Sequence, residues 1–476
     1  MKFTDYPGFT PVFRGRMTAV LFAVLLTGFG GWLHAQAPRD FVVDLQATVS
    51  ATVPHIRLSW TQRLQSNIVA QRIHRRLKGS TVWTRLATLG LAATGYADNT
   101  ALPGVEYEYW LERDLNATPT SVMPGSAMGY LSAGINIPAQ ENRGTLLLVI
   151  TAALAAPLAA ELNALETDLV CDGWTVKRIP LPATATVFSV KAAIKAAYAA
   201  NPGGVKMVYL FGHVPVPYSG NNSPDGHSEH KGAWSADGYY GDMDGYWGDS
   251  VERNTISTGT RNDNVPGDGK FDPSILPSTL ELAVGRVDLS RMTKAPSTSI
   301  TEVDLMRRYL KKAHEYRYRQ GAYVNIPRRA LIRDGLEQWM TGLTGWHWAY
   351  SALGRPPAVP IDVAPSGQWF STNYAGGRNY LIGYAAGYSS YELMGGVGTS
   401  TDFGSRPSRV VFLGMFGSYF GDWDSPNNLM RSVLAGNLSG NSLGLACMWS
   451  GAPHYFMHHT GMGEPVGYSV QFSQNG

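Results

Sequence analysis

The sequence predicts a multidomain protein in which an all-β sandwich precedes a larger α/β domain made of two subdomains. Three observations lead to this prediction. Short runs of alternating polar and apolar residues recur up to about residue 138. From residue 144 onward, apolar strand-like runs alternate with helical patterns. A hydrophobic content of 44%, with only 16% charged residues, is enough to bury the cores of several domains.

Residues 1–37 have the pattern of a secretory signal peptide. The basic residues Arg14 and Arg16 precede a short apolar run, and small residues follow it, so we expect cleavage after Ala35 or Ala37. The apolar run falls short of the roughly 20 residues that a membrane-spanning helix needs, and no later run reaches that length. We therefore expect an exported protein of the periplasm, cell surface or exterior, with no transmembrane segment in the mature chain.

Charge and cysteine content exclude two classes of protein. The net charge is +3 and the basic residues are scattered, so nucleic acid is not expected as a partner. The two cysteines, Cys171 and Cys447, lie in apolar contexts far apart in the sequence. We expect two buried thiols rather than a disulfide scaffold.

Residues 38–138 resemble a fibronectin type III module. The run IRLSW ends at Trp60, where that family places its core tryptophan, and residues 102–113 read LPGVEYEYWLER, close to the family's L-x-P-G-x-x-Y-x-Y pattern. The resemblance implies that Tyr107 or Tyr109 is the corner tyrosine, which hydrogen-bonds back to the main chain. No chemistry-bearing residues cluster here, which favours a spacer or adhesion module.

Residues 144–295 and 296–476 are predicted to form two αβα subdomains side by side. Strand-like and helical runs alternate in both, which predicts parallel sheets covered by helices. In the first subdomain the strands are TLLLVIT, WTVKRIPL, VKMVYLFGH and TLELAVGRVD. A long helix, ITEVDLMRRYLKKAHEYRYRQ, then precedes the second set of strands, RRALIRDG, NYLIGYAAG, SRVVFLGMFG and NSLGLACMWSG.

The order of these blocks resembles gingipain-type cysteine peptidases, whose second half is caspase-like. Three segments carry the resemblance, together with the long helix containing His-Glu-Tyr that follows the last of them: KMVYLFGHVPVP, SADGYYGDMDG and LELAVGRVDLSRM. The family's catalytic histidine would fall in residues 384–389, which contain none, and its cysteine where Met415 or Phe416 stands. The family's C-terminal segment is also missing, so we expect the sequence to be truncated.

Two sets of residues offer alternative catalytic groups. His213 and Cys447 each follow an apolar strand, as the members of a caspase-like dyad do. Asp422 and Asp424 could pair as general acid and base, or they could cap a helix that begins near Pro426. We favour the helix cap.

Two groups of side chains have the residue types and spacing of metal-binding sites. A Gly-rich stretch carries alternating carboxylates that resemble calcium loops of exported proteins. The predicted calcium ligands are Asp242, Asp244, Asp249, Asp263, Asp268 and Asp272. His454, His458 and His459 have the spacing of a zinc-binding helix, but Tyr455 stands where the expected glutamate would be.

The sequence therefore predicts an exported, non-catalytic gingipain-like protein that binds peptide or an extracellular polymer at the cell envelope or outside. Two alternatives stay open. One is a cysteine peptidase with a rearranged dyad of His213 and Cys447. The other is a hydrolase that uses Asp422 and Asp424, with the C-terminal histidines.

Overall fold

The computed structural model describes most of the chain from Pro38 to Gly476. The described residues are 38–61, 67–116, 125–257, 259–294, 300–356, 358–374, 377–450 and 454–476. The predicted signal peptide, residues 1–37, lies outside them. None of the helices within these ranges combines the length and the apolar character needed to cross a lipid bilayer.

The N-terminal module is a β-sandwich of two antiparallel sheets, with strand orders β1-β2-β5 and β4-β3-β6-β7. Its strands are β1 (Gln46–Ser50), β2 (His55–Ser59), β3 (Ile68–Leu77), β4 (Thr84–Thr88), β5 (Gly95–Asp98), β6 (Glu106–Leu115) and β7 (Ser126–Gly134). Trp60 is buried between the sheets, as predicted. The Tyr107 hydroxyl accepts a hydrogen bond from the backbone N–H of Leu102 at 3.2 Å, the bond expected of a corner tyrosine.

The first α/β subdomain contains a parallel sheet with strand order β13-β10-β8-β9. Its elements are β8 (Gly144–Thr151), α1 (Ala152–Ala155), α2 (Ala159–Cys171), β9 (Trp174–Leu181), α3 (Val187–Ala199), β10 (Val205–Phe211), β13 (Ala283–Val287) and, on its far side, α5 (Glu302–Arg317). Apolar side chains of α2 and α5 pack on one face of the sheet and those of α3 on the other. The predicted strands and helices are thus confirmed.

The second subdomain contains a parallel sheet with strand order β15-β14-β16-β20-β21. The strands are β14 (Ala330–Asp334), β15 (Ile361–Val363), β16 (Tyr380–Ala386), β20 (Val410–Phe416) and β21 (Ala446–Trp449). One face packs against α7 (Trp369–Tyr374), α8 (Ser400–Ser405) and α9 (Leu429–Ala435). The other packs against α6 (Leu343–Trp348) and the π-helix η8 (Ala349–Leu353).

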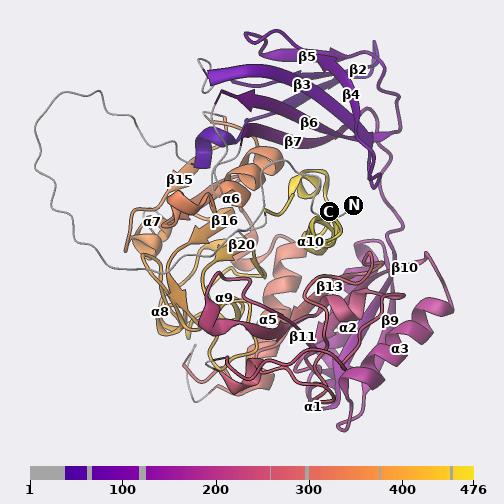
Figure 1. Ribbon diagram of the computed structural model, residues 1–476, viewed down its shortest axis with the longest axis vertical. Helices are drawn as coiled ribbons and strands as arrows, with labels where there is room; N and C mark the ends of the chain where they lie inside the picture. The colour runs from indigo at the N-terminus through magenta and orange to yellow at the C-terminus, as the bar shows by residue number, and fades with distance from the viewer. Residues whose placement is uncertain are drawn as a thin grey trace, which may run out of the picture.

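The sandwich is not a detached spacer. A single apolar cluster runs from the sandwich interior into α6, η8 and the adjoining sheet of the second subdomain. Arg39 donates to the Tyr350 hydroxyl at 2.9 Å across the same boundary. Figure 1 shows the sandwich lying directly against α6 and β15. The sandwich therefore packs on the second subdomain, and its role as a spacer or adhesion module stays a prediction.

Two segments cross between the α/β subdomains. The C-terminal helix α10 (Val466–Gln474) leaves the second subdomain and packs against β13, where Gln471 donates to the Leu280 carbonyl at 2.8 Å. The insertion between β10 and β13 carries β11 (Tyr218–Asn222) and β12 (Gly232–Ser235). It reaches the second sheet, where Ser235 donates to the Gly421 carbonyl at 2.7 Å. The insertion therefore brings side chains of the first subdomain to the carboxyl ends of β16 and β20.

Candidate functional site at the carboxyl ends of β16 and β20

The positions at which a caspase-like dyad would stand are neighbours in the structure. Strands β16 and β20 are parallel and adjacent, and Ala386 pairs with Phe416 where both end. The ends carry Gly387 and Phe416 instead of imidazole and thiol, and Phe416 stacks on Trp449 with ring centroids 5.8 Å apart. A stacked phenylalanine offers neither a nucleophile nor a base.

The structure does not bring His213 and Cys447 together. The Nδ1 atom of His213 lies 2.7 Å from Asp288 and 3.3 Å from the Ser290 hydroxyl, at the ends of β10 and β13. Cys447 lies within β21 opposite Leu413 and packs among apolar side chains, where burial raises the pKa of its thiol. A thiol held neutral in mid-strand is inert, so the rearranged dyad is wrong.

Asp422 and Asp424 are buried ion-pair partners and do not cap the helix. Helix α9 begins at Leu429, and its cap is Asn428, whose side chain accepts from the Met430 N–H at 3.0 Å. The preference for an aspartate cap is therefore wrong. Asp424 instead accepts from the Tyr218 hydroxyl at 2.5 Å and pairs with Arg261.

The predicted calcium loops are interlocked through their carboxylates. Asp249 of the first loop accepts from the backbone N–H groups of Gly267 and Gly269, at 2.7 and 2.8 Å. Asp272 of the second loop accepts in return from the N–H of Ser250 at 2.8 Å. These carboxylates satisfy turns, which is the non-metal role that aspartate plays in such loops.

The other predicted ligands divide into two groups. Asp268 accepts from the backbone N–H of Lys270 at 2.9 Å within its own turn, and a buried oxygen of Asp263 has no hydrogen-bond partner among the described residues. Asp242 and Asp244 gather with Glu281, with one ligand atom of each within 4.8 Å of the others. This second group retains the oxygen-rich chemistry of a calcium site, and calcium stays a prediction.

A serine, a histidine and a glutamate form a hydrogen-bonded chain just beyond β20. Ser418 Oγ lies 2.7 Å from His227 Nε2. The other ring nitrogen, Nδ1, lies 3.2 Å from Glu229 Oε1. Because the carboxylate faces Nδ1, this nitrogen carries the proton and donates to it, which leaves Nε2 to accept from the serine hydroxyl. The three groups stand in the order of a nucleophile, a base and an orienting acid.

A buried histidine holds the segment that carries His227 in place. His230 Nδ1 donates to Asp225 at 2.9 Å and its Nε2 donates to Asp422 at 3.0 Å, and all three side chains are almost fully buried. Burial alone would lower the pKa of His230, but the hydrogen bonds to both aspartates outweigh it and raise the pKa to about 9. The imidazolium therefore joins the insertion of the first subdomain to the loop after β20 at neutral pH.

The main chain around Ser418 is fixed on both sides. The Ser389 hydroxyl, beyond the end of β16, donates to the Ser418 carbonyl at 2.9 Å. Tyr419 has a φ of +68°, a left-handed conformation that is uncommon for a tyrosine, and its N–H donates to Asp225 at 3.1 Å. Strained turns of this kind occur where a strand end must present a side chain. We call Asp225, His227, Glu229, His230, Ser418 and Asp422 the strand-end cluster.

Sequence reasoning found only one member of this cluster, Asp422. His227 and Ser418 are 191 positions apart and come from different subdomains. The available signals were weak: a Gly-Ser pair directly after a buried strand, and two histidines flanking Ser-Glu in the insertion, SPDGHSEH. Neither signal shows that His227 and Ser418 are partners, because they meet only when the insertion between β10 and β13 folds against the second subdomain.

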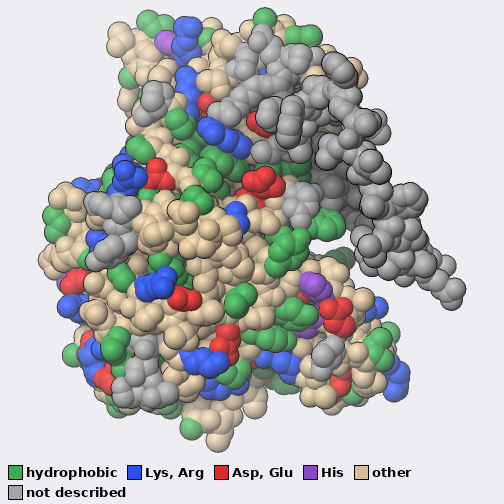
Figure 2. All heavy atoms as spheres, turned by 90° about the vertical axis from the view of Figure 1, so that its left-hand side faces the viewer, with side chains coloured by type: hydrophobic (Ala, Val, Ile, Leu, Met, Phe, Trp, Pro, Cys, Tyr) green, Lys and Arg blue, Asp and Glu red, His purple; other side chains and the backbone are tan. Residues whose placement is uncertain are grey.

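The face seen in Figure 2 has no large patch of only positive or only negative side chains. Lys and Arg side chains there alternate with Asp and Glu, and hydrophobic side chains are spread between them. This agrees with the small net charge.

No protein-family model matches the chain, and no curated protein matches it. Among solved structures, the fold is similar to the Arg-specific cysteine proteinase gingipain R, with a TM-score of 0.43 and 11% identity over 64% of this chain. The match spans 62% of that proteinase chain. A complex of the pro- and mature domains of RgpB from Porphyromonas gingivalis matches with a TM-score of 0.40, 10% identity, and coverage of 64% of this chain and 63% of that one.

A fibronectin type III-like protein from Clostridium thermocellum matches a shorter part of the chain. It has 20% identity and a TM-score of 0.15, covering 20% of this chain and 88% of the other. Likenesses this distant assign no activity to the strand-end cluster.

Proposed function

We propose that the protein is an exported hydrolase of the serine type, in which Ser418 is the nucleophile and His227 the general base. The observation that carries the proposal is the 2.7 Å contact between Ser418 Oγ and His227 Nε2, with Glu229 at the opposite ring nitrogen. A serine hydroxyl is a weak nucleophile until a base removes its proton, and this chain supplies that base.

The reaction would follow the acyl-transfer sequence of such triads. Ser418 Oγ attacks the carbonyl carbon of the substrate while its proton passes to His227 Nε2. The imidazolium is stabilised by Glu229, and Nε2 then gives the proton to the leaving amine or alkoxide. Water, deprotonated by the same Nε2, attacks the acyl group on Ser418 and releases the acid.

The substrate class that suits this site is an acyl compound that can approach from solvent, either a peptide or an ester. The side chains of His227 and Glu229 are 42% and 54% exposed, so a large substrate can reach them. Export and a gingipain-like, caspase-like architecture behind a fibronectin type III-like module belong to the same proposal, supported by the N-terminal pattern and the order of the sequence blocks.

A second candidate function is binding of peptide or polymer without catalysis. It is favoured by the two strand ends, where Gly387 and Phe416 stand in place of a catalytic histidine and cysteine. Thiol-dependent cleavage is expected in neither candidate, because burial raises the pKa of the half-buried Cys447 thiol and keeps it neutral. Cys447→Ala should therefore leave any activity unchanged. The expectation of two buried thiols is wrong for Cys171, which is exposed.

Hydrolysis assays separate the two candidates. The purified mature chain is given p-nitrophenyl esters and a fluorogenic peptide library, beside Ser418→Ala, His227→Gln and the surface control Ser80→Ala. We expect activity in the parent and the control, and a loss of about 10³-fold or more in the two site variants, whose residues act as a unit. Turnover that survives Ser418→Ala contradicts the proposal. A parent that binds peptide but turns nothing over supports the second candidate.

A further inference from the structure

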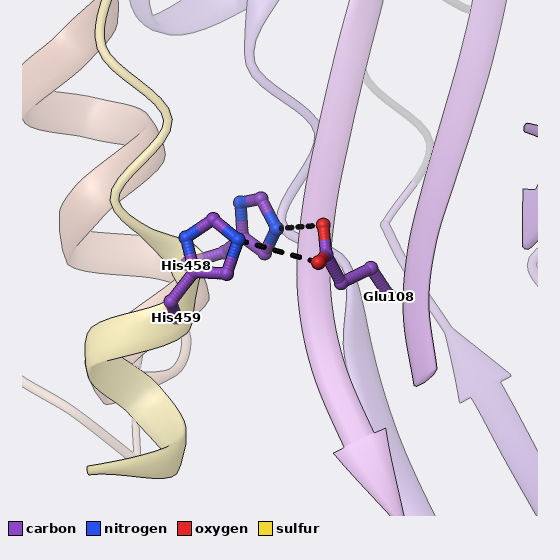
Figure 3. A group of neighbouring side chains, drawn as sticks. All are labelled: Glu108, His458 and His459. Carbon is purple, nitrogen blue, oxygen red and sulfur yellow. Dashed lines mark hydrogen bonds and ion pairs between the residues drawn. The ribbon is translucent and has the colours of Figure 1, made fainter. Parts of the chain in front are cut away.

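A second histidine pair lies at the boundary between the sandwich and the C-terminal segment. His458 and His459 belong to the 3₁₀ turn η10 (His458–Met462), and Glu108 projects toward them from β6 (Figure 3). His458 Nε2 lies 2.9 Å from Glu108 Oε2, and His459 Nε2 lies 3.4 Å from Oε1. All three side chains are at most 1% exposed.

An arginine completes the cluster and fixes its charge. Arg76 of β3 donates to Glu108 Oε2 through Nε at 3.0 Å and through a terminal nitrogen at 2.7 Å. The negative charge of Glu108 and the positive charge of Arg76 balance, so the cluster has no net charge when both imidazoles are uncharged. The Nε2–H of His458 can then donate to Glu108, and His459 Nε2 faces the other carboxylate oxygen. We call Arg76, Glu108, His458 and His459 the interface cluster.

The charges of the interface cluster also argue against a bound metal ion. A divalent cation bound by the two Nε2 atoms and Glu108 would add two positive charges next to Arg76, in a site closed to water. With both imidazoles uncharged, Arg76 already balances the charge of Glu108, so charge balance requires no such ion. Although burial would raise it, the pKa of Glu108 lies well below its usual range because of the hydrogen bonds from His458 and His459.

Further aromatic and charged groups face the cluster from every element packed against it. Tyr130 of β7 stacks on His458 at 5.8 Å, and Arg76 lies over the Phe472 ring of α10 at 4.4 Å. The titratable and charged groups around the cluster are His74 and Lys78 of β3, Glu106 of β6, Tyr130 of β7, His347 of α6, and His454, Glu464 and Tyr468 of the C-terminal segment.

We propose that the interface cluster makes the contact between the sandwich and residues 454–474 sensitive to acid: protonation of His458 opens it while the α/β sheets stay folded. A second proton on this ring would place a cation beside Arg76, with one carboxylate to balance the two. The side chains are closed to solvent, so water does not screen the repulsion between the imidazolium and Arg76. The segment that would be released links the sandwich to β13 through α10. This inference is independent of the proposed hydrolase.

The direction of the pH dependence follows from burial. Burial and the neighbouring His459 lower the pKa of His458 to about 4, and burial together with His454 and His458 lowers the pKa of His347 to about 3. In the open state a histidine titrates near 6.5. The open state therefore binds more protons between about pH 6.5 and 4, and the contact loses stability as the pH falls through this window.

Hydrogen exchange at pH 7.0 and 5.0, corrected for intrinsic rates, tests the proposal on the full chain. We expect the opening equilibrium of residues 466–474 to rise about 20-fold at pH 5.0 through His458 alone, while β8 and β10 keep their protection. His458→Gln should remove this rise, and His55→Gln, at a half-buried histidine in β2 of the sandwich, should retain it.

Three outcomes would overturn the inference. Protection of residues 466–474 that does not change with pH would do so, as would an equal loss in β8 and β10, which marks global acid unfolding. The third is a stoichiometric zinc ion at neutral pH whose removal by a chelator opens the same contact. If His458→Gln fails to fold, the comparison of segments in the parent chain still distinguishes these outcomes.

Discussion

The strand-end cluster and the interface cluster each contain a buried histidine that contacts a carboxylate, but His230 is charged at neutral pH and His458 is uncharged. His230 lies between two aspartates, and its pKa is raised to about 9. His458 shares one glutamate with Arg76 and His459, and its pKa is lowered to about 4. Both rings are almost fully buried, and burial lowers the pKa of each. At His230 two aspartates outweigh the effect of burial, whereas His458 has one glutamate, shared with Arg76, and a second histidine beside it.

The comparison also separates a structural from a chemical role. The interface cluster is closed to solvent and joins the sandwich to the C-terminal segment, which suits a contact between domains. The strand-end cluster has a buried ion pair beneath His227 and Ser418, and His227 stays open to solvent. A rigid buried support under an accessible nucleophile and base is what a catalytic site needs.

The largest expected effect concerns the countercharge at the interface. Arg76→Met keeps much of the side-chain volume but leaves Glu108 buried without a cation, and we expect a loss of about 3–5 kcal/mol in the free energy of unfolding. The matched control is Arg72→Met on the same strand, whose ion pairs are about a quarter exposed and should be worth less than about 1 kcal/mol. Denaturant titration measures both. Adding Glu108→Met to Arg76→Met should restore most of the loss, and no rescue would argue against the charge balance.

His230 and His458 should change the stability of the protein with opposite dependence on pH. A raised pKa means that the stabilisation from His230 is fully present below pH 6.5 and is lost as the pH rises through about 9. His230→Gln should cost at most about 3 kcal/mol near pH 6, and the cost should shrink toward pH 10. His458→Gln should show the reverse, with relative stability gained as the pH falls from 6.5 to 4. The melting temperatures of both variants and the parent, measured from pH 4 to 10, test these opposite pH dependences. If the two variants show the same dependence on pH, the explanation by countercharge is contradicted.

Calcium is expected to have the smallest effect. Asp242, Asp244 and Glu281 are the acidic side chains that the fold gathers in the long insertion. Binding of calcium to the folded state alone would raise the melting temperature by a few degrees, since a concentration of 100 Kd is worth about 2.7 kcal/mol. Asp244→Asn should reduce the rise, and Asp268→Asn, in a turn of the second loop, should leave it unchanged. A melting temperature that does not respond to calcium or to chelator would refute the prediction.

Most of the secondary structure could be predicted from the sequence, because buried parallel strands and amphipathic helices have strong periodic patterns. Strand β5 was missed because its four residues, GYAD, show no alternation of apolar side chains. The short elements α6, η8, β15 and α7 could not be predicted, because the aromatic, Pro-containing sequence between Leu343 and Tyr374 has no single period.

The functional groups could be predicted only in part, for a different reason. Asp422 stood out because acidic residues directly after a strand are visible locally. Glu108 and His458 are 350 positions apart, and His227 and Ser418 are 191 apart. Contacts of this range depend on how separate domains pack, and no local pattern records that. That residues 384–389 contain no histidine, in contrast, can be read directly from the sequence.

The most direct test of the central claim is the site at which a fluorophosphonate reacts with the purified chain. Such reagents form a covalent bond to a serine only where a neighbouring base activates the hydroxyl. Peptide mass spectrometry should find the adduct on Ser418, and it should be absent in Ser418→Ala and strongly reduced in His227→Gln. An unmodified Ser418 in folded protein, or an adduct that forms equally well without His227, would contradict the account.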